Sequence, residues 1–258
     1  GYCNQCELDR SGRGTQCNRK KEMPKRSSLD GNILGGGLSE YLVIPAWQII
    51  RMPHDVDMRH AALTEPLACC IHSIRKARLK FGDTVVIIGM GIMGYFHVKL
   101  AQMCGARIIV SKTDEEKRKT AIREGAAYAF DPRQCDVGEE IRRLTDGLGA
   151  DAVINTIPFK EVWQQAIDML APYGRLIAYS SQNSKEPIGV DFGMVHSREI
   201  EFIGTLNPTI EDNQMAVKLI GYQMIDMEKV IDREFSFAQG KEAFDYACKP
   251  SVYRVMIN

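Results

Sequence analysis

The chain has 258 residues, of which 45% are hydrophobic and 26% charged, and its formal net charge is zero. This composition is typical of a soluble globular protein with one large domain or two ordinary ones. The balanced charge gives no indication of binding to nucleic acid or to an anionic membrane surface. No apolar run approaches the roughly 20 residues that a membrane-spanning helix needs. We therefore expect the protein to bind neither nucleic acid nor a membrane.

The N-terminal part of the chain carries a cluster of cysteines with the spacing of a metal site. Cys3 and Cys6 are separated by two residues, and Cys17 follows. Thiolates spaced in this way can wrap one tetrahedral zinc ion, which needs a fourth ligand. Asp9 continues the two-residue spacing and is the preferred fourth ligand, with Glu7 as the alternative. Three unliganded thiols on a loop are the other interpretation of this cluster.

A glycine-rich segment provides the strongest functional indication. The apolar run Thr84–Ile88 predicts a buried strand, and a helix is expected over Met93–Cys104. A G-x-G-x-x-G pattern between a strand and a helix is typical of dinucleotide binding, with the phosphates at the helix N-terminus. The expected cofactor-binding residues in this segment are Gly89, Gly91, Ile92, Met93 and Gly94. A glycine-rich turn without a ligand is the alternative.

Strands and helices alternate through the middle of the chain. Besides Thr84–Ile88, the predicted strands are Arg107–Ser111, Tyr128–Phe130, Asp151–Thr156, Arg175–Tyr179 and Ile200–Ile203. Between them, helices are predicted over Asp114–Glu124, Val137–Thr145 and Lys160–Leu170. Thr113 and Glu116 have the spacing of a capping box for the first of these helices. This alternation predicts an α/β fold with a doubly wound parallel sheet.

The C-terminal part of the chain has a different pattern. Thr209 is expected to cap a helix that runs to about Tyr222. A second helix is predicted near Gln239–Cys248, followed by a terminal strand at Tyr253–Ile257.

Taken together, these segments resemble the zinc-dependent medium-chain alcohol and polyol dehydrogenases over essentially the whole chain. Cys3, Cys6, Asp9 and Cys17 occupy the four positions of that family's structural-zinc lobe, which usually holds four cysteines. The segment Ala61–Ala68 resembles the Glu-Pro-Leu segment of the sorbitol- and threonine-dehydrogenase-like branch. The resemblance implies that Glu65 lies beside a catalytic zinc, either as a ligand or next to one.

The resemblance also implies roles for residues near the nicotinamide cofactor. Thr205 and Asn207 match the return to the catalytic domain beside the nicotinamide, and Arg254 matches an arginine that contacts the pyrophosphate. Residues 67–206 would form the Rossmann domain. Residues 1–66 and 207–258 would form part of a β-rich, GroES-like catalytic domain, with the zinc lobe at residues 1–20.

The family's remaining catalytic zinc ligands, a cysteine and a His-Glu pair, belong to a segment expected before Gly1. We therefore expect residues 1–258 alone to bind dinucleotide without zinc-dependent alcohol oxidation. The five histidines show no zinc-ligand spacing, and surface or helix-packing roles are expected for each. Cys69, Cys70 and Cys104 lie in apolar sequence and are expected to be reduced core residues. For Glu65, a carboxylate stabilised by the N-terminus of a helix is the alternative.

The end of the second predicted strand bears on cofactor choice. Members of the family that use NAD carry an aspartate where this chain has Lys112, directly after Ser111. A cation cannot accept hydrogen bonds from the ribose hydroxyls but can bind a 2′-phosphate, so NADP is favoured over NAD. A lysine that points into solvent is the alternative.

The resemblance thus predicts a cytoplasmic, zinc-dependent oxidoreductase that transfers a hydride between a secondary alcohol or polyol and NAD(P). The implied cofactors are structural and catalytic zinc together with the dinucleotide. A homodimer or homotetramer is expected. A zinc-free quinone or enone reductase of the same fold and a non-catalytic dinucleotide-binding protein are the alternatives.

Overall fold

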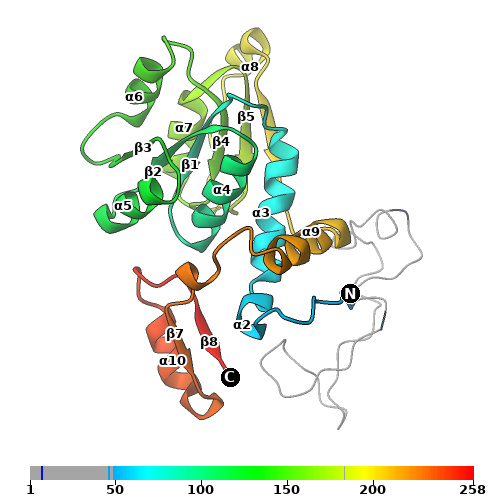
Figure 1. Ribbon diagram of the computed structural model, residues 1–258. Coiled ribbons are helices and arrows are strands. Elements are labelled where there is room, and N and C mark those ends of the chain that lie inside the picture. The colour runs from blue at the N-terminus through cyan, green and yellow to red at the C-terminus, as the bar shows by residue number, and fades with distance from the viewer. Residues whose placement is uncertain (1–6, 8–45, 47–48, 183) are drawn as a thin grey trace.

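The computed structural model describes residues 7, 46, 49–182 and 184–258 (Figure 1). Its centre is a six-stranded parallel sheet with the strand order β3-β2-β1-β4-β5-β6. The strands are β1 (Thr84–Ile88), β2 (Arg107–Ser111), β3 (Tyr128–Phe130), β4 (Ala150–Asn155), β5 (Leu170–Ala178) and β6 (Glu201–Gly204). The order reverses between β1 and β4, as in a doubly wound dinucleotide-binding sheet, so the predicted fold class is confirmed.

Helices connect the strands and cover both faces of the sheet (Figure 1). They are α2 (Met58–Ala61), α3 (Thr64–Ala77), α4 (Ile92–Met103), α5 (Glu115–Arg123), α6 (Val137–Leu144), α7 (Lys160–Asp168), α8 (Phe192–Arg198), α9 (Ile210–Gly221) and α10 (Gly240–Ala247). Two short 3-10 helices, η4 (Glu228–Val230) and η5 (Phe237–Gln239), lie between α9 and the C-terminus.

The central strand β1 shows why the sheet is stable with helices on both sides. Val85 and Ile87 pack in the core formed with α3, α4, α5 and α9, whereas Val86 and Ile88 pack in the core formed with α6 and α7. Side chains alternate between the two faces of a strand, so a strand buried on both faces must be apolar throughout. The run Thr84–Ile88 meets that requirement and is buried along its whole length.

A small unit at the C-terminus lies beside this domain. The strands β7 (Arg233–Phe235) and β8 (Val255–Ile257) pair in parallel, and α10 packs against both. Figure 1 shows these elements next to α2 and the start of α3, on the side of the molecule away from α8. Among the residues that the structure describes, no helix combines the length and apolarity needed to cross a membrane.

The predicted capping box of α5 is wrong. The N-cap is Asp114, whose carboxylate accepts a hydrogen bond from the Lys117 amide at 2.8 Å. Aspartate is at least as good an N-cap as threonine, and it lies one residue closer to the first helical turn. By contrast, Thr209 caps α9 as predicted, in a capping box with Asp212.

The expectation for three central cysteines is only partly confirmed. Cys70 is fully buried, but Cys69 and Cys104 are partly exposed. All the cysteines for which the structure gives a placement are free thiols: Cys69, Cys70, Cys104, Cys135 and Cys248.

Candidate dinucleotide and metal site

The glycine segment connects β1 to α4 at the carboxyl edge of the sheet. Gly89 has a φ of +102°, in the region that favours glycine. A Cβ atom at Gly94 would lie 2.2 Å from the carbonyl oxygen of Gly89, so the helix can approach the turn this closely only with glycine there. Gly91, the N-cap of α4, has no protein atom within 4 Å of the position that a Cβ would occupy.

The space at Gly91 is what a pyrophosphate would need. Among the described residues, no side chain hydrogen-bonds to the N-terminus of α4; α3, α7 and α10 share this feature, whereas α5, α6, α8 and α9 have a side-chain cap. The first amides of a helix carry a partial positive charge and need acceptors. Phosphate oxygens can supply them, and Ile92 and Met93 are the first two residues of this helix. The residues present therefore fit the dinucleotide.

The end of β2 lies next to this turn. The Gly89 amide donates to the Ser111 carbonyl at 2.9 Å, which joins the turn to the second strand. Ser111 is buried, whereas Lys112 is half-buried. The Lys112 backbone is held at both ends: its amide donates to Phe130 at 3.0 Å, and its carbonyl accepts from Arg118 at 2.8 Å. Within the described residues, the Lys112 ammonium has no hydrogen-bond partner.

The chain also returns to this edge of the sheet after β6. The Thr205 amide and hydroxyl both donate to the Ala178 carbonyl, at 3.2 and 3.4 Å, which places the return segment beside the end of β5. Asn207 is exposed and has a φ of +55°.

The C-terminal segment lies close to the start of α4. The Tyr253 ring packs 6.1 Å from the Tyr95 ring, and the Lys117 ammonium lies 2.9 Å from the centre of the Tyr253 ring. Burial lowers the pKa of Lys117 to about 8. Arg254, the next residue, lines a 560 Å³ cavity that Glu65 also lines. The structure thus brings Glu65 and Arg254 to one cavity, whose lining includes no residue of the glycine segment.

Glu65 is an exposed carboxylate in the first turn of α3. The Cys69 thiol, one helical turn further, lies 3.3 Å from the Glu65 Oε1 atom and donates a hydrogen bond to it. Burial, and then the charge of Glu65, raises the pKa of Cys69 to about 12. A carboxylate oxygen is a zinc ligand, so the donor atom of Glu65 fits the ion that the family implies.

Two buried polar atoms near this edge have no partner among the described residues. They are the Nδ2 atom of Asn155, at the end of β4, and the hydroxyl of Ser180, just after β5. The Ser180 amide donates to the Asn155 carbonyl at 3.1 Å, so the two residues are neighbours. Buried polar groups are normally hydrogen-bonded, and water is the usual partner when protein atoms are not.

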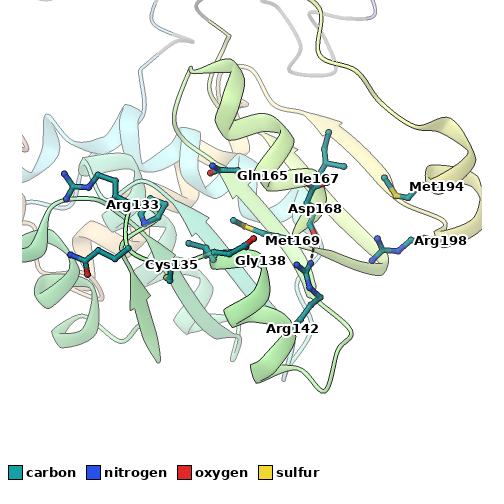
Figure 2. A pocket seen from close by; sticks show the side chains of 14 residues that line it. Arg133, Cys135, Gly138, Arg142, Gln165, Ile167, Asp168, Met169, Met194 and Arg198 are labelled. Atoms are coloured by element: carbon teal, nitrogen blue, oxygen red, sulfur yellow. Dashed lines mark hydrogen bonds between the residues drawn. The ribbon is translucent and has the colours of Figure 1, made fainter.

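A second groove, of 850 Å³, is formed by α6, α7, α8 and the loop after β3 (Figure 2). None of the predicted site residues lines it. Its arginines already have partners: Arg142 donates to the Asp168 carbonyl at 3.1 Å, Arg198 to the Leu170 carbonyl, and Arg133 to Asp131 at 2.8 Å. These contacts stabilise the junction of α7 with β5 and the turn after β3. The three arginines therefore have structural roles in this groove.

The histidines have the roles expected for them where the structure shows their contacts. His97 is fully buried and hydrogen-bonds to Ser73 of α3 at 2.9 Å, and burial lowers its pKa to about 4. His60 lies within ligand distance of Asp57 and Glu228, a grouping that sequence spacing could not show because Glu228 is far along the chain. The Arg59 guanidinium donates to both carboxylates, at 2.5 and 2.8 Å, and also to Glu234, so its single positive charge offsets only part of theirs.

The predicted structural-zinc ligands Cys3, Cys6, Asp9 and Cys17 lie outside the described residues. The structural-zinc site therefore stays a prediction.

Comparison with known proteins identifies the family. The zinc-binding dehydrogenase family matches residues 89–221, and the chain belongs to it. A sorbitol dehydrogenase from Halalkalibacterium halodurans is 28% identical over 244 residues, covering 94% of this chain and 69% of the relative. A D-arabitol-phosphate dehydrogenase from Enterococcus avium is 25% identical over 258 residues, covering 99% and 71%.

Solved structures agree with this assignment. A zinc-binding dehydrogenase from Sinorhizobium meliloti, bound to NADP, superposes with a TM-score of 0.87 at 25% identity. The match covers 100% of this chain and 74% of that one. A zinc-binding dehydrogenase from Clostridium scindens gives a TM-score of 0.88 at 25% identity, covering 100% and 70%. The expected family is therefore confirmed, and the chain is a dehydrogenase of this fold.

Sequence reasoning missed Cys69 as a neighbour of Glu65. The i to i+4 spacing would have revealed it, but a helix starting near Glu65 was considered only as the alternative for that residue, and its extent over Thr64–Ala77 was not predicted.

Proposed function

We propose that the protein is a zinc-dependent oxidoreductase that transfers a hydride between a secondary alcohol or polyol and NAD(P). The observation that carries the proposal is the open space at Gly91 above the uncapped N-terminus of α4. The relatives named above act on sorbitol and on a phosphorylated arabitol, which supports polyols as the substrate class. Assaying a panel of polyols with both cofactors, with and without a chelator, tests the proposal.

Each part of the site has a distinct task in this proposal. The α4 N-terminus binds the pyrophosphate, and Arg254 adds a cation at the same cavity as Glu65. Thr205 and Asn207 shape the wall beside the nicotinamide. Zinc, held in part by Glu65, would polarise the alcohol oxygen and lower its pKa, while the cofactor accepts the hydride. The protein residues bind, orient and shield these groups.

We further propose that Lys112 makes NADP(H) the preferred cofactor. Its backbone is fixed by Phe130 and Arg118, and its ammonium has no partner among the described residues. Asp114, the nearest carboxylate downstream of Lys112, caps α5 through its Oδ1 atom. Lys112 thus places a cation where the NAD-using members of the family carry an aspartate, which favours the 2′-phosphate of NADP(H).

Lys112→Asp is expected to weaken NADP(H) binding by roughly 10- to 100-fold and to improve NAD(H) binding. A charge-assisted hydrogen bond contributes about 1.5–3 kcal/mol, which corresponds to that change in affinity. Titrations followed by the fluorescence of the reduced cofactors measure both constants. Lys80→Asp, at an exposed position outside the site, is the control and should leave both unchanged. Equal affinities of the unmutated protein for the two cofactors would refute the preference.

A structural zinc bound by Cys3, Cys6, Asp9 and Cys17 remains part of the proposal on the strength of the spacing alone. Asp9→Ala is expected to reduce the zinc content of protein prepared without chelator, because a tetrahedral structural site needs all four ligands. Elemental analysis measures the content. If the variant keeps its zinc, Asp9 is not the fourth ligand, and Glu7→Ala then becomes the comparison. If the unmutated protein contains no zinc, the site itself is wrong.

A further inference from the structure

Tyr253, the residue before Arg254, joins the C-terminal unit to the two helices that follow β1 and β2. Its ring packs against the Tyr95 ring of α4, with 6.1 Å between the ring centres, and the Lys117 ammonium of α5 lies 2.9 Å from its centre. The Tyr253 and Arg254 amides both donate to the Asp232 carboxylate, at 2.5 and 3.0 Å. The backbone and the ring of Tyr253 are therefore held by separate contacts, and both fix the point from which the Arg254 side chain starts.

Lys117 is buried, although a lysine is rarely buried unless its charge is paired. Among the described residues its ammonium has no hydrogen-bond partner, and the group in direct contact with it is the Tyr253 ring. The face of an aromatic ring attracts a cation, and the attraction is stronger where water is excluded. The carboxylates of Asp232 and Asp114 attract the ammonium from further away, and Lys112 repels it. The cation–π contact is thus what compensates most directly for the burial of this charge.

We propose that Lys117 is a positioning residue of the cofactor site, which acts on the pyrophosphate through Tyr253 and Arg254. Its ammonium holds the Tyr253 ring against the helices, and the next residue, Arg254, then lines the cavity that Glu65 also lines. Without this contact the turn before β8 is freer, and fixing Arg254 again when the cofactor binds costs affinity. The inference rests on the proposed function, because it takes Arg254 as the cation that binds the pyrophosphate. Lys117 itself touches neither cofactor nor substrate in this arrangement.

The contact attracts the ring strongly only while Lys117 is protonated. Burial lowers the pKa of Lys117 to about 8, against the opposing attraction of Asp232 and Asp114. Below that pH the ammonium carries its charge, and as the pH rises through about 8 the amine becomes neutral and the cation–π attraction is lost. Cofactor affinity should therefore fall by roughly three- to tenfold between pH 7 and about pH 9.5.

Other groups around the ring do not produce this change. Burial raises the pKa of Tyr253 to about 12, so its hydroxyl stays protonated over the same range. The other charges that act on the ring are those of Asp232, Glu124, Asp114 and Arg123, residue types that do not titrate above pH 7. The pH dependence can therefore be assigned to the lysine by replacing it.

Cofactor titrations over this pH range test the proposal without relying on activity. NADPH and NADH are each titrated, with fluorescence detection, against the unmutated protein, Lys117→Met, Lys117→Arg, Tyr253→Leu and the double variant. Lys249→Met is the matched control, because the Lys249 ammonium also lies over a tyrosine ring, that of Tyr246 at 4.4 Å. Lys249 is exposed, and neither it nor Tyr246 lines the cavity. Urea unfolding confirms that each variant is folded.

At pH 7, Lys117→Met should bind both cofactors roughly three- to tenfold more weakly than the unmutated protein, and its affinity should fall no further towards pH 9.5. Lys117→Arg, whose guanidinium stays charged, should keep its affinity at both pH values. Tyr253→Leu should behave like Lys117→Met, and the double variant should be no weaker than either single variant, because both changes remove the same contact. Lys249→Met should follow the unmutated protein throughout.

Three results would overturn the proposal. Unchanged affinity of Lys117→Met at pH 7 would show that the contact has no effect on the cofactor. A loss confined to NADPH would place Lys117 on the 2′-phosphate beside Lys112. A loss that adds in full to that of Tyr253→Leu would mean that the ammonium contacts the cofactor directly.

Arg254→Met separates this inference from the proposed function. If Arg254→Met weakens the binding of both cofactors while Lys117→Met does not, the inference fails and the pyrophosphate contact stands. If Arg254→Met leaves both affinities unchanged, the pyrophosphate contact of the proposed function fails and the inference fails with it. Weaker binding of both cofactors in both variants, with the pH dependence lost in Lys117→Met, is the result we expect.

Discussion

Gly94→Ala is expected to abolish dinucleotide binding, with a loss of affinity of roughly 100-fold or more. The added methyl would lie 2.2 Å from the Gly89 carbonyl oxygen, so the turn and the start of α4 must separate. The amides that bind the pyrophosphate then move from their positions, and displacements of about 1 Å can cost that much. Fluorescence titration with reduced cofactor measures the loss, and unfolding by urea should show a lower stability.

Gly91→Ala provides the matched comparison. No atom of the described residues lies within 4 Å of the new methyl, and alanine is a poorer N-cap than glycine, so stability should fall by no more than about 1 kcal/mol. The methyl nevertheless fills the space proposed for the pyrophosphate, so cofactor affinity should fall strongly. Gly189→Ala, which also meets nothing within 4 Å, should change neither property. If Gly91→Ala binds cofactor as well as the unmutated protein, the pyrophosphate does not lie where we place it.

Asp212→Ala is expected to destabilise the protein by about 3–5 kcal/mol at neutral pH, because it removes one partner of a buried ion-pair network. Asp212 is fully buried and joins α9 to α3. Its carboxylate accepts hydrogen bonds from His72 at 2.8 Å, from Arg75 at 2.7 Å and from the Thr209 hydroxyl at 2.7 Å. Urea unfolding measures the change.

The same carboxylate should make stability depend on pH. Burial alone would raise the pKa of Asp212, but hydrogen bonds from His72, Thr209 and Arg75 hold it well below its ordinary value. A depressed pKa means that the stabilisation is present above the unfolded-state value of about 3.9 and is lost as the pH falls towards the folded-state value. The difference in stability between the unmutated protein and Asp212→Ala should therefore shrink below about pH 4.

Glu211→Ala is the control for this network. Glu211 also contacts Arg75, at 2.8 Å, but it is exposed, so the change should cost less than about 1 kcal/mol. A loss from Asp212→Ala as small as that from Glu211→Ala would show that the network does not hold α9 against α3.

Local sequence was enough to predict the central strands. The bounds of β1, β2 and β3 agree with the structure. For β1 and β2 the reason is that a strand buried on both faces is a largely apolar run between turn residues, whereas β3 is a half-buried edge strand. The strand β5 begins at Leu170, five residues before the predicted Arg175. The intervening segment contains Pro172 and Gly174 and resembles a turn, and the structure accommodates it as an irregularity in the pairing with β4.

The elements that were missed depend on contacts far apart in sequence. The strand β7 has three residues, too few for a periodic pattern, and is defined by its pairing with β8 more than 20 residues later. The helix α3 lacks a side chain hydrogen bond at its N-cap, Leu63, so its start carries no capping signal. Because the extent of α3 was not predicted, Cys69 was not recognised as the neighbour of Glu65. By contrast, the strand end, the three glycines and the helix start that a dinucleotide site needs all lie within the seven consecutive residues Ile88–Gly94.

Transfer of deuterium tests the central claim, zinc-dependent hydride transfer, most directly. Enzyme that holds the full set of catalytic-zinc ligands implied by the family is incubated with oxidised cofactor and a polyol deuterated at its secondary carbinol carbons, and the reduced cofactor is analysed by NMR. We predict deuterium at C4 of the nicotinamide, and its loss when a chelator removes the catalytic zinc. Deuterium transfer that persists in metal-free protein, or none from any polyol in folded, zinc-loaded protein that binds cofactor, would contradict the account.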